Sequence, residues 1–292
     1  MRMKSFELEH KVDIAWCPAC GNFGILSAIK MALDELGIDP KKTVLSSGIG
    51  QAAKTPQYIK SHYFNGLHGR SLPVAEGIKA SNPDLTVIAD SGDGDIYGEG
   101  GNHFIHAIRR NPDIAVIVHN NMIYGLTKGQ ASPTTLKGMK TPIHVEGVWQ
   151  EPFNPIAVAI ALGASFVGRA NIGDLVHTKE MIKKAVTHKG FALLDIFQPC
   201  VVFNKLNTYA WYKEHSYILP EEYDPSDRVA AIQKAWEDDR YPLGVIYTNP
   251  NKQQTFCEGL GVYDDDKRPL FERYYDAQAL ESIAAQYKVG SQ

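Results

Sequence analysis

The sequence predicts an α/β fold in which a parallel sheet is flanked by helices. Two observations carry this prediction: apolar runs rich in β-branched residues recur along the first two-thirds of the chain, and stretches of helical period lie between them. Each interval is long enough for the strand–helix–strand crossover that parallel strands need. With 292 residues, of which 44% are hydrophobic, the chain can also bury a sizeable core.

The expected elements follow in order along the chain. A helix is predicted over residues 21–37, because apolar residues recur at spacings of three and four and Gly37 stands where a C-terminal cap would. Strands are predicted at Thr43–Leu45, Thr86–Ala89, Ile114–Val118, Ser165–Val167 and Ala192–Phe197. The stretches His103–Arg110 and Gly173–His188 are expected to be crossover helices between these strands.

The composition changes after Cys200. Residues 201–292 are rich in Tyr, Asp, Lys and Pro, with one helical stretch at Asp227–Glu237 and few strand signals. The chain is therefore divided into an α/β domain of residues 1–200 and a C-terminal extension of residues 201–292. We expect this extension to pack on the core or on a partner subunit.

Charge and cysteine usage exclude several classes of function. The chain has 30 Lys and Arg against 33 Asp and Glu, for a net charge of −3, which gives no electrostatic attraction to nucleic acid or to an anionic membrane. No apolar run approaches membrane-spanning length, and the first residues are charged rather than typical of a secretory signal. The tetrapeptide Cys17-Pro18-Ala19-Cys20 suggests a metal or redox site in a reducing compartment, and we expect a cytoplasmic protein.

A glycine-rich turn follows the predicted strand Thr86–Ala89. Its glycines, Gly92 and Gly94, would let the backbone approach phosphate oxygens closely. A nicotinamide site is disfavoured, because the next glycine, Gly98, is one residue too far along for the dinucleotide fingerprint. The next strand also ends without an acidic residue for a ribose.

The residues around this turn suit a magnesium ion that carries a diphosphate. Asp93 and Asn121 follow consecutive predicted strands, and the carboxyl ends of parallel strands meet at one crevice. Mg²⁺ prefers oxygen ligands, of which one or two are carboxylates, and the carbonyl of Ile123 is a third candidate. The alternative is that both segments are only tight turns.

Five motifs in succession resemble one enzyme family. They are Cys17-Pro18-Ala19-Cys20-Gly21, Ser47-Gly48-Ile49-Gly50, Leu67-His68-Gly69-Arg70, Gly92-Asp93-Gly94-Asp95 and Tyr124-Gly125-Leu126-Thr127-Lys128-Gly129-Gln130. This order is similar to that of the thiamine diphosphate-binding β subunit of 2-oxoacid:ferredoxin oxidoreductases, and most like the 2-oxoglutarate type. The resemblance covers roughly the first two-thirds of the chain.

The resemblance implies a cofactor site. Mg²⁺ would be held by Asp93, Asn121 and the Ile123 carbonyl. The residues implied to lie around thiamine diphosphate are Ile49, Gly50, His68, Gly92, Gly94, Asp95, Tyr124, Gly125, Leu126 and Thr127. His68 and Lys128 are the candidate catalytic residues, and Lys54, Arg70 and Lys128 are the candidates for binding the substrate carboxylate.

The cysteines form a second candidate site. A Cys-x-x-Cys pair such as Cys17 and Cys20 presents two thiolates on one side of a turn, and Cys200 is the natural third ligand of the [4Fe–4S] cluster that the family implies. The fourth ligand is open, because Gln51 stands where relatives often carry a cysteine. Cys257 is the remaining cysteine, and a carboxylate, a histidine or a residue of the partner chain are the other candidates. Zinc in the same site, or Cys200 and Cys257 as ordinary buried thiols, are the alternatives.

The activity that the resemblance implies is oxidative decarboxylation of a 2-oxo acid, in the first place 2-oxoglutarate, to acyl-CoA and CO₂. Electrons would pass through the cluster to ferredoxin, and the reverse reaction would fix CO₂ by reductive carboxylation of succinyl-CoA. Glu76, in a predicted helix, and Glu99, beside the turn, are poor candidates for the glutamate that activates the cofactor. An α subunit with the pyrimidine-binding half is therefore expected, in an αβ or (αβ)₂ assembly.

Three other functions remain open from the sequence. The substrate could be pyruvate or a broad range of 2-oxo acids. The chain could belong to a non-redox thiamine diphosphate decarboxylase or carboligase in which the cysteines hold structural zinc. It could also be a zinc module that only docks a partner, in which case it would need the cysteines but not the turn at Gly92–Asp95.

Overall fold

The computed structural model describes residues 5–237, 239–251 and 254–287. Within these residues, eight strands form one sheet in the order β2-β1-β3-β4-β6-β5-β8-β7. The strands are β1 (Thr43–Ser47), β2 (His62–Asn65), β3 (Thr86–Gly92), β4 (Ile114–Asn120), β5 (Phe166–Asn171), β6 (Phe191–Phe197), β7 (Ser216–Ile218) and β8 (Tyr241–Thr248). All neighbouring strands are parallel except β5 and β8, which are antiparallel.

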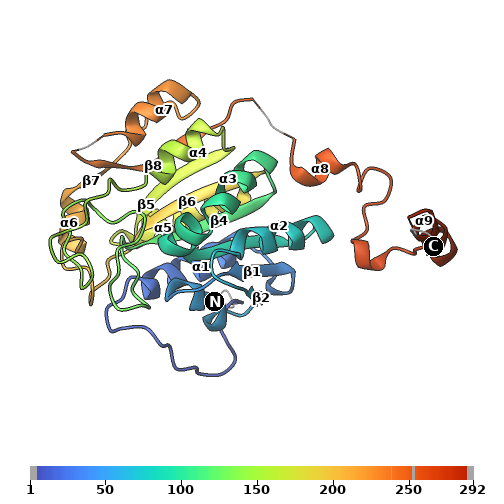
Figure 1. The fold of residues 1–292 in the computed structure, drawn as a ribbon, viewed down its shortest axis with the longest axis horizontal. Coiled ribbons are helices and arrows are strands. Elements are labelled where there is room, and N and C mark those ends of the chain that lie inside the picture. The colour runs from blue at the N-terminus through green and yellow to red at the C-terminus, as the bar shows by residue number, and fades with distance from the viewer. Residues whose placement is uncertain (1–4, 238, 252–253, 288–292) are drawn as a thin grey trace, which may run out of the picture.

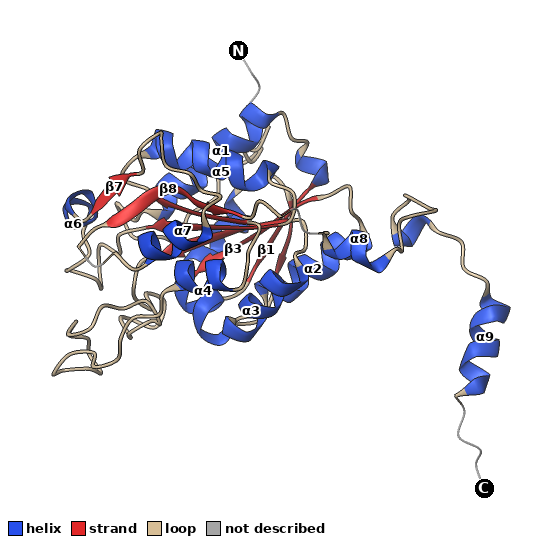
Figure 2. Ribbon diagram, turned by 90° about the horizontal axis from the view of Figure 1, so that it is seen from above, coloured by secondary structure: helices blue, strands red, loops and turns tan. Residues whose placement is uncertain are grey.

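Helices cover both faces of the sheet. They are α1 (Asn22–Leu36), α2 (Ser71–Ser81), α3 (Gly101–Arg110), α4 (Pro155–Ala161), α5 (Leu175–Thr187), α6 (Tyr209–Glu214), α7 (Arg228–Ala235), α8 (Phe256–Leu260) and α9 (Ala277–Gln286). Figure 2 shows α1 and α5 on one face and α2, α3 and α4 on the other. No helix among the described residues is long and apolar enough to cross a membrane.

The central strands are apolar along their whole length because both of their faces are buried. In β4, Val116 and Val118 belong to the core cluster under α2, α3 and α4, whereas Ala115 and Ile117 belong to the cluster under α1 and α5. This pattern is typical of parallel sheets that are covered on both sides. It explains why the central strands could be found from apolar runs alone.

The five predicted strands and the helix-forming stretches before Cys200 are confirmed, with small differences in their ends. Gly37 caps α1 in the left-handed conformation, with φ of 69°. The side chain of Asp174 caps α5 by accepting a hydrogen bond from the backbone N–H of His177. Strand β2 was not predicted; it lies at the edge of the sheet with all four residues exposed and therefore lacks an apolar run.

The part of the chain after Cys200 forms two strands that were not predicted. Strand β8 pairs with β5, β7 pairs with β8, and the predicted helix at Asp227–Glu237 forms as α7. Pro242 and Gly244 interrupt the apolar pattern of β8, so no strand was predicted there. The antiparallel β8 also makes the sheet mostly, rather than fully, parallel.

The sheet ends at Thr248, and α8 and Tyr263 then contact α2 before the chain leaves the body of the molecule. Figure 1 shows the segment that carries α8 and α9 running away beyond α2. The Tyr263 hydroxyl donates to the Ala80 carbonyl at 2.7 Å, which ties the first part of this segment to the end of α2. No residue of α9 is buried.

The carboxylate of Asp95 joins three loops at the carboxyl edge of the sheet. Asp95 lies in the short π-helix Gly94–Glu99, which follows β3. Its Oδ1 accepts hydrogen bonds from the backbone N–H groups of Ile49 at 2.9 Å and Gly69 at 2.7 Å. The loop after β1 passes so close that a Cβ atom on Gly48 would lie 2.2 Å from Asp95 Oδ2. Glycine is therefore required at position 48.

Replacing Gly48 with alanine should destabilise the protein. We expect a loss of about 1–3 kcal/mol in the free energy of unfolding, because the new methyl group overlaps a carboxylate that two backbone donors hold in place. Urea denaturation of the purified protein measures this loss. Gly77→Ala in α2 is the control: its Cβ would meet open space, so the same change should stabilise the helix by about 0.5–1 kcal/mol. Equal effects of the two substitutions would contradict the prediction.

Candidate functional site

A cavity of about 80 Å³ opens at the carboxyl edge of β1, β3 and β4. It is lined by Ile49, Gly50, Gln51, Ala52, His68, Gly92, Asp93, Gly94, Asp95, His119, Asn121, Ile123, Tyr124, Gly125, Leu126 and Thr127. These lining residues include every residue predicted to lie around the cofactor and its metal ion. Four loops that are far apart in the sequence thus meet in one place, as the parallel topology requires.

Asp93 is one of two buried acids that line this cavity, the other being Asp95. The hydroxyl groups of Ser132 and Thr134 both donate to its Oδ2, each at 2.6 Å, which orients the carboxylate. The pKa of Asp93 is raised to about 6, mainly by burial and also by the nearby Asp195, while the two hydroxyl donors oppose the shift. A buried carboxylate of this kind is most stable beside a cation, and its oxygens are of the type that Mg²⁺ prefers.

The loop after β4 brings an amide and a carbonyl to the same cavity. The Asn121 Oδ1 atom accepts a hydrogen bond from the N–H of Ile123 at 3.0 Å, and the intervening Met122 is left-handed, with φ of 56°. The Asn121 carbonyl is held by the side-chain amide of Asn204 at 3.0 Å. The donor set of Asp93, Asn121 and Ile123 therefore consists of one carboxylate, one amide and one carbonyl, which fits Mg²⁺.

Tyr124 closes the turn at Gly94. Its hydroxyl donates to the Gly94 carbonyl and to Glu99 Oε2, at 3.1 Å each, and a Cβ on Gly94 would lie 2.1 Å from its ring. The Nδ1 atom of His68 lies 3.1 Å from Asp95 Oδ1 and 3.2 Å from Glu99 Oε2. His68 is thus placed in the cavity wall with two carboxylates beside one of its ring nitrogens.

The three cations predicted to bind substrate do not line the cavity. Arg70 contacts the ring of His103 in α3, and Lys54 lies in the 3₁₀ turn Ala52–Tyr58. Lys128 is exposed, with φ of 69°, one residue beyond Thr127 of the cavity wall. The two glutamates that are poor candidates for activating the cofactor have other partners: Glu76 is paired with Arg110, and Glu99 accepts a hydrogen bond from the Tyr124 hydroxyl.

Three of the four cysteines meet in a second cavity, of about 50 Å³. Cys17, Cys20 and Cys200 line it together with Gln51 and mainly apolar neighbours. Cys20 accepts a hydrogen bond from the side-chain amide of Gln198 at 3.4 Å. The pKa of Cys20 is raised to about 11, mainly by burial and also by the nearby Cys200 and Cys17. Within the described residues, no three His, Cys, Asp or Glu side chains are grouped to hold a single metal ion.

Cys257 does not belong to this cavity. It lies in α8, where its Sγ is 3.7 Å from the carbonyl of Lys79, and Lys79 is bound to Leu85 and Asp113 at the amino ends of β3 and β4. Cys200 follows the carboxyl end of β6. Seven-residue strands such as β4 and β6 span about 20 Å, so the prediction of Cys257 as a fourth ligand beside the other three cysteines was wrong.

The two cavities share part of their walls. Gln51, Asn121 and Gly125 line both of them. A Cβ atom on Gly125 would lie 3.9 Å from Cys200 Sγ, so the turn at Tyr124–Thr127 separates the thiol from the first cavity by a single backbone. A group bound by the cysteines would therefore be a direct neighbour of a group bound at Asp93.

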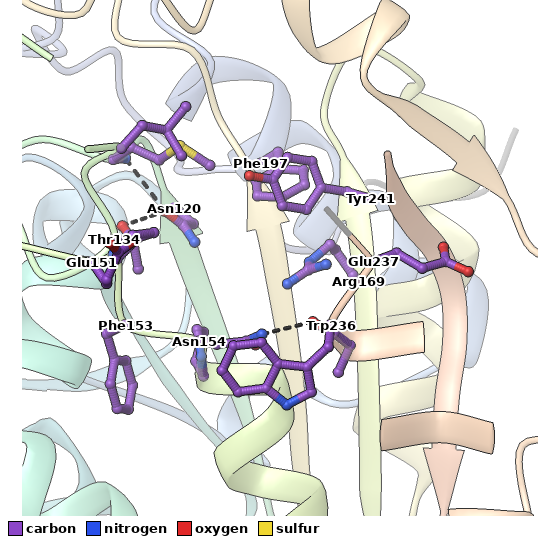
Figure 3. Close-up of a pocket in the computed structure, with 15 residues that line it drawn as sticks. Asn120, Thr134, Glu151, Phe153, Asn154, Arg169, Phe197, Trp236, Glu237 and Tyr241 are labelled. Atoms are coloured by element: carbon purple, nitrogen blue, oxygen red, sulfur yellow. Dashed lines mark hydrogen bonds between the residues drawn. The ribbon is translucent and has the colours of Figure 1, made fainter. Parts of the chain in front are cut away.

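A third cavity, of about 350 Å³, lies behind Thr134. Figure 3 shows Arg169 pointing into it beside Phe197 and Tyr241, and its guanidinium lies 5.0 and 5.3 Å from the centres of those rings. Tyr241 comes from β8, so the part of the chain after Cys200 forms one wall. Trp236 and Glu237 line the same side.

A buried hydrogen-bond network connects this third cavity to Asp93. Asp195 of β6 accepts hydrogen bonds from the Tyr97 hydroxyl at 2.8 Å and from the side-chain amide of Asn120 at 3.1 Å. The Thr134 hydroxyl donates to Asn120 Oδ1 at 3.0 Å as well as to Asp93, and Figure 3 shows the bond to Asn120. Burial raises the pKa of Asp195, so the network contains a further buried acid.

Several site residues were not found from the sequence. Ser132 and Thr134 orient Asp93, Gln198 donates to Cys20, and Trp16 donates to the Gln51 carbonyl at 2.7 Å. The run Ser132-Pro133-Thr134-Thr135 is a cluster of hydroxyl groups that could have drawn attention to this loop. The others act through single contacts between distant segments, which no local pattern predicts.

Two family models match the chain. The model described as "Thiamine pyrophosphate enzyme, C-terminal TPP binding domain" matches residues 45–196. A model of the C-terminal part of the pyruvate ferredoxin oxidoreductase β chain matches residues 200–273. The first match contains the strands and loops that form the Asp93 cavity, apart from the first two residues of β1. The second contains β7 and β8.

Individual relatives cover most of the chain. It is 49% identical over 248 residues to the 2-oxoacid:ferredoxin oxidoreductase subunit beta of Saccharolobus solfataricus, a match to 80% of this chain and 81% of the relative. It is 47% identical over 273 residues to subunit beta of 2-oxoacid:ferredoxin oxidoreductase 1 of Aeropyrum pernix. That match covers 88% of this chain and 86% of the relative.

A solved structure is similar over nearly the whole chain. It is the 2-oxoglutarate:ferredoxin oxidoreductase from Magnetococcus marinus with 2-oxoglutarate, coenzyme A and succinyl-CoA bound. The two structures superpose with a TM-score of 0.89 at 35% sequence identity, and the match covers 99% of this chain and 97% of the solved chain. The resemblance seen in the sequence motifs is thereby confirmed. The chain belongs to the β subunits of the 2-oxoacid:ferredoxin oxidoreductases, which are thiamine diphosphate-dependent oxidoreductases.

Proposed function

We propose that this β subunit, with an α partner, converts 2-oxoglutarate and coenzyme A into succinyl-CoA and CO₂ while electrons pass through an iron–sulfur cluster to ferredoxin. The observation that carries this proposal is the shared wall between the Asp93 cavity and the three-cysteine cavity, formed by Gln51, Asn121 and Gly125. A decarboxylation site beside a redox site is the arrangement that such a reaction needs. The low potential of such clusters would also allow the reverse direction, reductive carboxylation of succinyl-CoA.

Asp93, Asn121 and the Ile123 carbonyl would hold Mg²⁺, and with it the diphosphate of the cofactor. The oriented carboxylate of Asp93 supplies the negative charge, and the amide and carbonyl complete an oxygen donor set. The tight Gly94 turn against Tyr124 brings the backbone to the cavity without a side chain in the way. When bound, thiamine diphosphate supplies the electron sink for decarboxylation of a 2-oxo acid.

His68 is proposed to position a proton in this cavity. Its Nδ1 lies beside the carboxylates of Asp95 and Glu99, which favours a proton on that nitrogen. Asp95 is in turn held by the N–H groups of Ile49 and Gly69, so the imidazole lies beside a fixed carboxylate. Its place in the wall brings it within the same 80 Å³ space as Asp93.

Cys17, Cys20 and Cys200 would hold a cluster of the [4Fe–4S] type. Thiolates are the ligands that iron–sulfur clusters take, and the apolar lining of the cavity suits a cluster shielded from water. Because burial raises the pKa of Cys20 to about 11, iron must displace its proton on binding. The Gln198 donor would remain as a hydrogen bond to sulfur.

The proposal of 2-oxoglutarate as substrate rests on the solved neighbour, which contains 2-oxoglutarate, coenzyme A and succinyl-CoA. Lys128, exposed next to the cavity wall, remains the candidate for the distal carboxylate, with Lys54 and Arg70 as helpers. A broader 2-oxo acid specificity, pyruvate included, is the second candidate, because the two relatives are named for 2-oxo acids in general.

The α subunit is proposed to complete the active site. No glutamate lines the Asp93 cavity among the described residues, so the glutamate that activates the cofactor would come from the partner. The exposed helix α9 is proposed to pack on that partner, since none of its residues is buried in this chain. Ferredoxin would be the redox partner of the complete αβ or (αβ)₂ enzyme.

Asp93→Asn should weaken cofactor binding in the αβ complex. The substitution keeps the shape and an oxygen acceptor for Ser132 and Thr134 but removes the charge that would hold Mg²⁺, so we expect affinity to fall by about tenfold or more. Equilibrium dialysis of thiamine diphosphate in Mg²⁺ measures the loss. Asp84→Asn, at an exposed position, is the matched control and should bind normally. Normal binding by Asp93→Asn would contradict the magnesium site.

Cofactor affinity should depend on pH through Asp93. Its pKa is raised to about 6, so below that pH a proton competes with Mg²⁺ and we expect affinity to fall by up to about tenfold per pH unit. Dialysis between pH 5 and 7.5 measures this slope, and titration of free thiamine diphosphate with Mg²⁺ at each pH corrects for the protonation of its own phosphate. A corrected affinity that stays constant over this range would show that Asp93 is not a ligand.

Substrate choice is tested by comparing kcat/KM for 2-oxoglutarate and pyruvate in the αβ complex supplied with coenzyme A and ferredoxin. We expect a preference for 2-oxoglutarate, and Lys128→Met should lower its kcat/KM by about 10–100-fold while leaving the value for pyruvate nearly unchanged, because only 2-oxoglutarate has a distal carboxylate. Equal values for both substrates would support the broad specificity. Decarboxylation without ferredoxin reduction, by a complex that contains zinc, would support the non-redox function.

A further inference from the structure

We propose that the cluster is bound through three thiolates of this chain, with the amide of Gln51 in place of a fourth, so that one of its irons is readily lost and exchanged. This inference rests on the proposed function, which places an iron–sulfur cluster at Cys17, Cys20 and Cys200. It concerns how that cluster is held and how it responds to oxidation. A four-iron cubane is ordinarily bound by four cysteines.

The fourth cysteine of the chain is too far away to serve. The chain has four cysteines, and Cys257 lies beside Lys79 at the opposite edge of the sheet from Cys200. The rise of a parallel strand sets that separation at about 20 Å, several times the size of a cluster. Any fourth ligand from this chain must therefore be a side chain that lines the cavity.

Gln51 is fixed in the cavity wall by the segment that carries Cys17. The indole N–H of the buried Trp16 donates to the Gln51 carbonyl at 2.7 Å, so the backbone of Gln51 is bound next to the first cysteine. Its side-chain Oε1 is buried and has no hydrogen-bond partner among the described residues. Leaving a buried acceptor unpaired costs about 1–3 kcal/mol, which suggests that this oxygen has a partner in the loaded protein.

The other polar side chains that line the cavity are already engaged. The Asn22 Oδ1 atom contacts the His119 ring at 2.9 Å, and the Asn121 Oδ1 atom accepts from the N–H of Ile123. The Gln198 amide donates to Cys20 and to the Pro199 carbonyl. Among the side-chain atoms that line this cavity in the described residues, Gln51 Oε1 is thus the one that is both buried and without a hydrogen-bond partner.

An amide oxygen is a much weaker ligand for cluster iron than a thiolate, because iron–sulfur clusters favour soft sulfur donors. The iron beside Gln51 is therefore the one that leaves when the cluster is oxidised. The step is [4Fe–4S]²⁺ → [3Fe–4S]⁺ + Fe²⁺ + e⁻, with the electron taken by a one-electron oxidant such as ferricyanide. Three thiolates then hold the remaining three irons, and added Fe²⁺ with a reductant reverses the step.

The test uses the αβ complex purified without oxygen and treated with one equivalent of ferricyanide. Iron assay and electron paramagnetic resonance (EPR) then follow desalting. For the natural sequence we expect a fall from about four to about three irons per β subunit, with the EPR signal of an oxidised three-iron cluster, and recovery on adding Fe²⁺ and dithiothreitol. Gln51→Cys, which supplies a fourth thiolate, should keep about four irons and give little of that signal.

Two further variants keep the test decisive. Gln51→Glu has the same size but an anionic oxygen, and should slow the loss of iron several-fold even if Gln51→Cys fails to assemble. Cys257→Ser is the control and should behave as the natural sequence does, because its sulfur lies away from the cavity. Neither result depends on enzyme activity.

The proposal is overturned if the natural sequence keeps about four irons after oxidation, since a strong fourth ligand would then come from the partner chain. It is also overturned if assembled Gln51→Cys and Gln51→Glu both lose iron as fast as the natural sequence. If neither the natural sequence nor Gln51→Cys contains iron, the redox part of the proposed function fails instead, and this inference fails with it. A stable four-iron cluster leaves the proposed function intact.

Discussion

The carboxylate of Asp95 is the contact on which the arrangement of the site depends. It accepts hydrogen bonds from the backbone N–H groups of Ile49 and Gly69. These bonds connect the loops after β1 and β2 to the turn after β3. Gly48 is needed for the first loop to pass the carboxylate, and His68 stands beside it. A buried carboxylate that accepts several backbone donors is a rigid support, because leaving those donors unpaired would be costly.

Each of the two neighbouring cavities contains an ionisable side chain whose pKa is raised by burial. Desolvation raises the pKa of Asp93 to about 6 and that of Cys20 to about 11, so burial opposes the charged form of each group. The protein orients both groups in advance, through the hydroxyls of Ser132 and Thr134 and through the amide of Gln198. Binding of a metal ion at either place would therefore relieve a cost already present in the folded chain.

The part of the chain after Cys200 has two roles. Up to Thr248 it completes the sheet, and Tyr241 packs over Arg169 beside the buried Asp195, so this stretch belongs to the body of the protein. Beyond Tyr263, which is tied to the end of α2, the chain leaves that body, and no residue of α9 is buried. A boundary at Cys200 marks the change in composition, but the change from sheet to extended segment comes later.

The sequence by itself determined strands β1, β3, β4, β5 and β6, the loops of the Asp93 cavity and the family, because buried parallel strands are apolar throughout and glycines and polar residues at their ends form local patterns. It could not determine which residues meet across those loops. The separation of Cys257 from the other cysteines, the hydroxyl donors to Asp93 and the unpaired oxygen of Gln51 were decided only by the tertiary structure. The physical reason is that each depends on the packing of segments far apart in the chain, whereas sequence patterns report the periodicity and chemistry of neighbours.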